Sequence, residues 1–165
     1  MDKLNSLQDL FVHELKDLYS AEQQILKALP KMAEAAEHQE LRRAFEEHER
    51  MTRDQVQRLD MIADDLGLDI TGHKCKGIEG IIREGDELLN AKGAADVRDA
   101  GLIGAAQRVE HYEMAGYGTA RTFARRLGHT QAADLLQQTL DEEGRTDQRL
   151  TSIAEGLVNR DAQMG

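Results

Sequence analysis

The sequence predicts an all-α fold, an antiparallel four-helix bundle with one long crossover that contains a short extra helix. The composition excludes much strand, because strands favour β-branched and aromatic residues and the 165-residue chain has only 4% aromatics and no Trp. Apolar residues also recur at steps of three and four along four long segments, as in amphipathic helices. This length is typical of one domain, so we predict a single domain over 1–165.

The first two helices are predicted over 4–36 and 39–66. Pro30 lies near the end of the first segment, where it is expected to kink or loosen the last turn. Gly67 follows the second segment and is a plausible C-cap. Because the link between the two segments is short, these helices should pack antiparallel.

The stretch 69–94 is rich in glycine and is predicted to be the crossover, with a short helix near 77–91. The third and fourth helices follow over 97–127 and 130–158, and the polar tail 159–165 is expected to fray. One long crossover between the second and third helices is the connectivity of ferritin-like bundles.

Charge and apolar content limit the partners. The formal net charge is −10, so we expect no nucleic-acid partner, since such proteins usually have a basic surface. No apolar run approaches the roughly 20 residues that cross a bilayer, and we expect no membrane partner. The single Cys75 excludes an intramolecular disulfide, and the N-terminus lacks the apolar run of a signal peptide. We therefore expect a cytoplasmic protein.

Each of the four apolar stripes is interrupted near its middle by an acid or a histidine. Helical spacing places these residues on the inward faces. They are Glu22, His48, Glu110 with Glu113, and Glu143 with Asp147. Buried carboxylates without partners are costly and repel one another, so another group must neutralise them.

Metal ions would neutralise such a group. Carboxylate and imidazole ligands suit iron and manganese, and also zinc. Glu110 and Glu113 are spaced i, i+3, and Glu143 and Asp147 are spaced i, i+4, so each pair shares a helix face. His111 should point aside from this face.

The alternative is a paired polar network without metal. Arginines reaching inward would balance the acids, and four are available: Arg42, Arg43, Arg108 and Arg145. Two tyrosines, Tyr19 and Tyr117, either donate hydrogen bonds to the acids or only fill space.

The chain also resembles the YciE/YciF-like family of bacterial ferritin-like stress proteins over nearly its whole length. The stretches that carry the resemblance are 17–23, 44–48, Lys74-Cys75 with Glu79-Gly80, 97–100, 105–113, 115–119, and 140–143 with Thr146-Asp147. The resemblance implies a ferritin-like bundle, a homodimer, a link to stress responses and a centre of two metal ions. The ions would be iron first, with manganese or zinc as alternatives, and no established reaction is implied. The implied ligands are Glu22, His48, Glu110, Glu113 and Glu143, with Asp147 as a possible further ligand or supporting acid.

The second helix departs from the family pattern at one position. The family has His-x-x-Glu-Thr, whereas this chain has Met51 three residues after His48. Thioether sulfur is a poor ligand for a hard cation. The site would then use Glu47 or Gln55, take up water, or hold one metal weakly.

Two functions follow from these observations. The first is a di-iron or di-manganese protein that handles oxygen, peroxide or metal stress. The second is a structural or interaction dimer whose metal site is vestigial or empty. No catalytic residue is predicted for either function.

Overall fold

The computed structural model describes residues 4–164, and all regular secondary structure within this range is helical. The long helices are α1 (Leu7–Ala35), α2 (Gln39–Leu66), α3 (Lys76–Leu89), α4 (Ala95–Leu127) and α5 (Thr130–Ile153). Between residues 4 and 164, no helix is both long enough and apolar enough to cross a bilayer.

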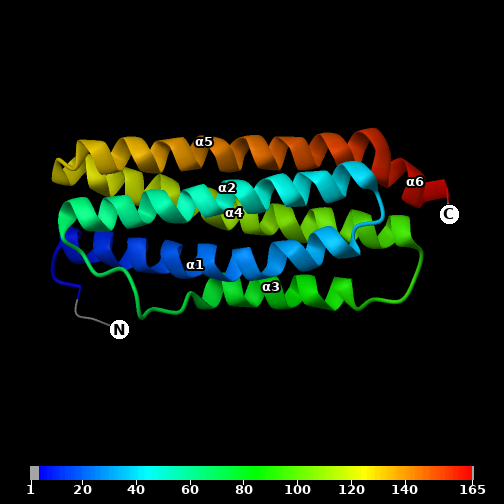
Figure 1. The fold of residues 1–165 in the computed structure, drawn as a ribbon, viewed down its shortest axis with the longest axis horizontal. Helices are drawn as coiled ribbons and strands as arrows, with labels where there is room; N and C mark the ends of the chain where they lie inside the picture. Colours follow the sequence, from blue (N-terminus) through cyan, green and yellow to red (C-terminus); the bar gives the residue numbers. More distant parts are fainter. Residues whose placement is uncertain (1–3, 165) are drawn as a thin grey trace.

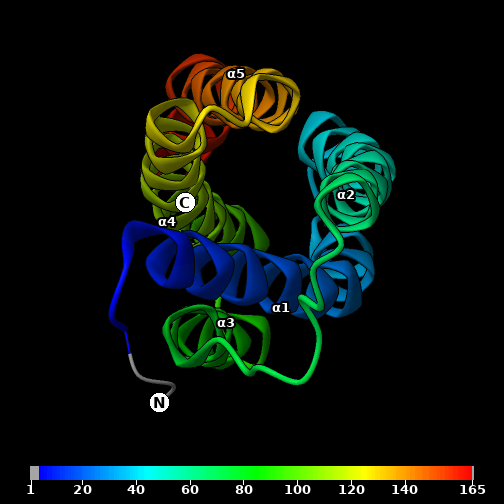
Figure 2. The same ribbon diagram turned by 90° about the vertical axis from the view of Figure 1, so that its left-hand side faces the viewer.

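Helices α1, α2, α4 and α5 lie side by side along the longest axis of the molecule (Figure 1). Seen from the end, they surround a common core, with α1 packed on α2 and α4, and α5 packed on α4 and α2 (Figure 2). Helix α3 lies outside this group, against α1 and α4. The crossover therefore covers one side of the core.

Local sequence signals set several helix ends. Gly67 and Gly128 adopt left-handed conformations with φ of 63° and 81°, and they end α2 and α4. Glycine is favoured there because it has no Cβ to clash. Helix α1 continues through Pro30 to Ala35, so the proline does not end it.

The C-terminal region differs from the prediction. The predicted helix over 130–158 is α-helical as far as Ile153 and continues as a π-helical turn over Ala154–Val158. A further helix, α6 (Asn159–Met164), then packs against α4, so the tail expected to fray is helical as far as Met164. The buried side chain of Val158 explains this order, because it joins the apolar core beside α4.

Polar contacts fix the start of α3. The carboxylate of Asp17 on α1 accepts hydrogen bonds from the Tyr112 hydroxyl (2.6 Å) and the Cys75 thiol (3.1 Å). Gly77 lets the helix approach closely, since a Cβ there would lie 2.5 Å from Cε2 of Tyr112. These contacts tie the beginning of α3 to both α1 and α4.

Two apolar clusters divide the core along its length. One contains Phe11 and Leu59, and the other contains Phe45 and Leu102. Along α1 the change from one cluster to the other falls around Glu22. The inward polar residues therefore lie at mid-length, with apolar layers on both sides.

Candidate metal centre

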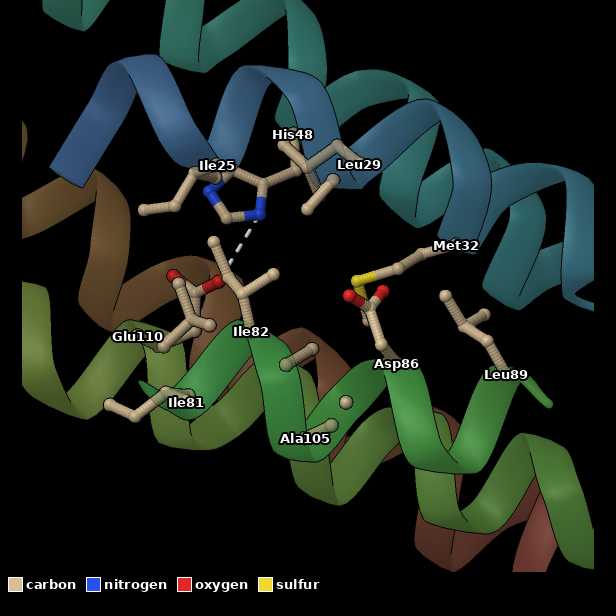
Figure 3. A pocket seen from close by; sticks show the side chains of 14 residues that line it. Ile25, Leu29, Met32, His48, Ile81, Ile82, Asp86, Leu89, Ala105 and Glu110 are labelled. Carbon is tan, nitrogen blue, oxygen red and sulfur yellow. Dashed lines mark ion pairs between the residues drawn. The ribbon is translucent and has the colours of Figure 1, made fainter. Parts of the chain in front are cut away.

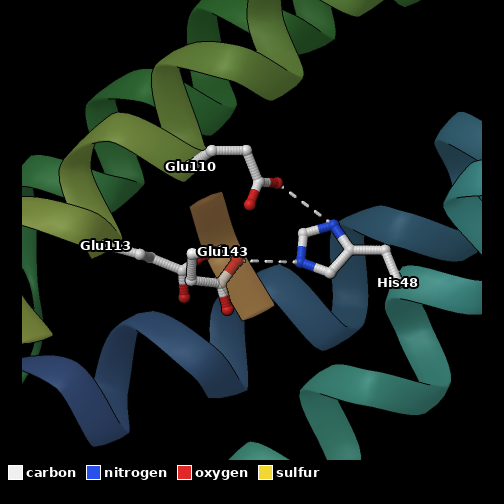
Figure 4. A group of neighbouring side chains, drawn as sticks. All are labelled: His48, Glu110, Glu113 and Glu143. Atoms are coloured by element: carbon white, nitrogen blue, oxygen red, sulfur yellow. Dashed lines mark ion pairs between the residues drawn. The ribbon is translucent and has the colours of Figure 1, made fainter. Parts of the chain in front are cut away.

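Four buried side chains meet in the middle of the core. His48 comes from α2, Glu110 and Glu113 from α4, and Glu143 from α5 (Figure 4). One ligand atom from each residue lies within 4.8 Å of the others. Within residues 4–164, this is the one group of three or more such side chains arranged closely enough to hold a metal ion.

The imidazole of His48 lies between two carboxylates. Its Nδ1 is 3.1 Å from Oε1 of Glu110, and its Nε2 is 3.5 Å from Oε2 of Glu143. Neither contact has the geometry of a hydrogen bond, since Oε1 of Glu110 and Nε2 of His48 have no hydrogen-bond partner. The histidine is thus close to both acids without saturating either.

Glu22 on α1 is fully buried next to this cluster. The hydroxyl of Tyr117 donates a hydrogen bond to its Oε1, whereas Oε2 has no partner. Of the two candidate tyrosines, Tyr117 therefore supports a core acid. Tyr19 is only half-buried and interacts with Asp60 instead.

Asp147 does not join the four-residue group. Its carboxylate oxygen Oδ1 is 3.2 Å from Nε2 of His111 and accepts a hydrogen bond from Nε2 of Gln107 at 3.2 Å. The side chain of His111 is 66% exposed, so it points aside as predicted. The i, i+4 spacing put Asp147 on the correct face of α5 but not within reach of the cluster.

The core acids have many unsatisfied atoms. Both carboxylate oxygens of Glu110, Glu113 and Glu143 are buried without a hydrogen-bond partner. A buried polar group left in this way costs about 1–3 kcal/mol. A cation in contact with several of these oxygens would remove that cost.

The predicted arginines do not neutralise the acids. Arg42 donates to the carbonyl of Ala36, and Arg145 donates to that of Asp141. Within residues 4–164, none of Arg42, Arg43, Arg108 and Arg145 forms an ion pair with a core acid.

Proximity and burial shift the pKa values of the acids. Burial, followed by the charge of Glu143, raises the pKa of Glu22 to about 8. The same two causes raise the pKa values of Glu110 and Glu113 well above the usual range. Burial also opposes ionisation of Glu143, but the close approach of Glu110 and His48 to its carboxylate outweighs burial and lowers its pKa. Without metal, the protonated forms of Glu22, Glu110 and Glu113 are therefore favoured more than in a free carboxyl group.

The residues around Met51 narrow the choice of substitute ligand. Sδ of Met51 accepts a 3.8 Å hydrogen bond from the Thr146 hydroxyl, so Met51 faces α5. The suggestion that Glu47 replaces the missing acid is wrong, because its side chain is 47% exposed and pairs with Arg149 on the surface. Gln55 is buried, and its Oε1 has no partner.

Sequence reasoning missed one ion pair beside the centre. Arg58 on α2 forms two hydrogen bonds of 2.6 and 2.7 Å with the carboxylate of Glu142 on α5. Its charge also lowers the pKa of Glu22. The i, i+3 spacing of Gln55 and Arg58 could have indicated this pair, because it places both side chains on one face of α2, where both contact Glu142.

Three carboxylates and an imidazole thus meet at mid-length in the core. The fold and this group together define the class: a helical protein with a candidate metal-binding site in its core. The chain belongs to the family described as "Domain of unknown function (DUF892)", whose model matches residues 6–163. The resemblance to YciF-like stress proteins is thereby confirmed, since the chain is 44% identical to protein YciF of Escherichia coli K12 over 97% of both chains.

Solved structures agree with this assignment. The crystal structure of the E. coli stress protein YciF matches with a TM-score of 0.92 at 44% identity, covering 94% of this chain and 99% of that one. The structure of YcfI from Rhodopseudomonas palustris matches with a TM-score of 0.89 at 39% identity, covering 93% of this chain and 98% of that one. A protein from Xanthomonas campestris pv. campestris, 23% identical, shares the fold with a TM-score of 0.76 over 96% and 97% of the chains.

Proposed function

We propose that this chain is a single-domain, ferritin-like four-helix bundle that binds two metal ions in its core and acts in a stress response. The observation that supports the proposal most is the set of buried, unpartnered oxygens on Glu110, Glu113 and Glu143. Together with His48 and Glu22, these residues would be the ligands. Asp147, which contacts His111, would be a supporting acid whose negative charge acts on Glu110.

Charge supports two divalent ions. Four buried glutamates carry four negative charges when ionised, which matches the charge of two divalent cations. The raised pKa values of Glu22, Glu110 and Glu113 show that positive charge is favoured at these carboxylates, and protons can supply it when no metal is bound. Metal binding would replace these protons.

The ligand types favour iron, with manganese or zinc as alternatives. An iron or manganese pair supplies redox chemistry toward oxygen or peroxide when it is bound. The residues of the chain would hold the ions, exclude bulk water and keep the Glu22 carboxylate oriented through Tyr117. Met51 leaves one fewer acid than the family pattern, so we expect weaker binding than in relatives that have a glutamate there.

A second candidate is a structural or interaction homodimer with a vestigial site. Met51 favours it, and so do the raised pKa values of Glu110 and Glu113, because protons can neutralise these acids without metal. For either function we also propose a homodimer and a cytoplasmic location. Light scattering on the purified protein tests whether it is a dimer.

Thermal unfolding with and without Mn²⁺ tests the proposed function. A ligand at 100 times its Kd stabilises the native state by about 2.7 kcal/mol, which is a rise in Tm of roughly 5–10 °C for a chain of this size. Glu110→Gln should lose this rise, and the exposed control Glu47→Gln should keep it. Equal shifts in both variants, or no shift in the wild type, would contradict the proposal.

A further inference from the structure

A small cavity lies between α3 and the body of the molecule (Figure 3). It measures about 30 Å³, and 14 residues line it. His48, Asp86 and Glu110 are the polar residues among them, and the rest are apolar. The cavity therefore extends from the underside of α3 to two members of the candidate metal centre.

Small residues leave this space open. Gly85 on α3 faces Ala105 on α4, where an added Cβ would lie 3.6 Å from that of Ala105. Ala28 on α1 lines another part of the wall, and Ile82 and Leu89 line it from α3 (Figure 3). Larger side chains at the small positions would fill the cavity.

The chemistry of the lining selects its occupant. Apolar cavities tend to stay dry and to accept small apolar guests, this cavity is apolar over most of its wall, and about 30 Å³ is enough for one small molecule. A polar guest such as peroxide would need several hydrogen-bond partners along the wall. A path for hydrated cations would need a series of acids, whereas Asp86 is the one acid among the lining residues outside the candidate metal centre.

We infer that this cavity is a binding and entry site for dioxygen, which reaches the metal centre beneath α3 at His48 and Glu110. The inference rests on the proposed function, because dioxygen in this cavity can react only if metal ions are bound at the centre. It goes further by naming the small molecule and the side from which that molecule approaches. Both oxygens of Glu110 are buried without partners, so they are available to metal at the inner end of the cavity.

The direct test needs no metal. Dissolved dioxygen is paramagnetic, so methyl NMR of the metal-free protein under oxygen pressure should show enhanced relaxation of the Ile25 and Leu29 methyls, which line the cavity and are buried from bulk solvent. Buried methyls far from the cavity, such as those of Leu59 and Leu136, should change little. Uniform relaxation across all buried methyls would overturn the inference.

A filled cavity gives the matched comparison. Ala28→Phe should lower the enhancement at the buried Ile25 by about fivefold or more, since the ring occupies the space. Val97→Phe, at an exposed position on the same molecule, should leave it within about twofold of the wild type. Enhancement that persists in Ala28→Phe would contradict the inference, and the wild-type measurement stands even if that variant does not fold.

Oxygen uptake links the cavity to the centre. In ferrous-loaded protein, Ala28→Phe should bind as much iron as the wild type and consume dioxygen more slowly by about fivefold or more. Equal rates would contradict the inference. Failure of the proposed function looks different, because the metal-free protein would then bind dioxygen in the cavity but take up no metal.

Discussion

The hydroxyl of Tyr117 on α4 donates a hydrogen bond to Oε1 of Glu22 on α1, and both side chains are fully buried. This bond joins the two helices at the level of the candidate metal centre. It lowers the pKa of Glu22, in opposition to the stronger effect of burial. Tyr117 thus favours the ionised form of Glu22, the form that the proposed metal binding requires.

Tyr117→Phe tests this relationship. Without the hydroxyl, Oε1 of Glu22 loses its donor in the core, and we expect the free energy of unfolding to fall by about 1–3 kcal/mol. Metal binding should weaken by about tenfold, because the carboxylate is then less well oriented and more readily protonated. The half-buried Tyr19→Phe is the control, and equal losses in both variants would contradict the assigned role.

Glu113→Ala should abolish metal binding while the helical fold is retained. Glu113 is fully buried and both its oxygens lack partners, so we expect its carboxylate to serve metal binding rather than a structural network. Elemental analysis and circular dichroism measure the two properties, with Glu47→Ala as the exposed control. A Glu113→Ala protein that still bound both ions at full affinity would exclude this residue as a ligand.

The metal-free protein should become less stable as the pH rises from about 5 to 8. Glu22 has a native-state pKa of about 8 and a usual value of 4.5, so between these values the native state holds more protons than the unfolded state. The free energy of unfolding therefore falls with pH, by up to about 1.4 kcal/mol per unit for each such acid. Glu110 and Glu113 act in the same direction.

Urea unfolding at several pH values with a chelator present measures this slope, and Glu22→Gln should reduce it. Added metal should reverse the trend, because metal competes with protons for the same oxygens. A metal-free protein whose stability rose over this range would show that the core acids are already ionised.

Met51→Glu should strengthen metal binding by about tenfold or more. The position faces α5 next to Thr146, one turn from His48, and the resemblance to the YciE/YciF-like family implies an acid there. The metal-free variant should be less stable, since it adds another acid near Glu143. Met51→Gln, which has similar length and no charge, is the control, and equal affinity in the two variants would contradict the prediction.

Much of the candidate site could be predicted because helical spacing determines which residues share a face. Glu110, Glu113 and Tyr117 follow each other at steps of three and four, and the structure buries all three. Likewise, Gly67 and Gly128 end helices where their conformational freedom is needed. These features depend on local sequence, which periodicity describes well.

Other features depend on how neighbouring helices are aligned, which no single helix encodes. Asp147 shares a face with Glu143 but lies beside Gln107 and His111, and Glu47 pairs with Arg149 at the surface. The cavity beneath α3 also requires Gly85 to lie opposite Ala105 on α4. Contacts between residues distant in sequence set these positions, so helical periodicity could not predict them.

The central claim is that the buried cluster around His48 and Glu110 is a metal centre. Elemental analysis of protein purified without chelator or affinity tag, then loaded anaerobically with ferrous iron, tests it most directly. The account predicts about two ions per chain, as in two-metal carboxylate bundles. A well-folded chain that took up no metal would contradict it and would leave the core acids as a network neutralised by protons.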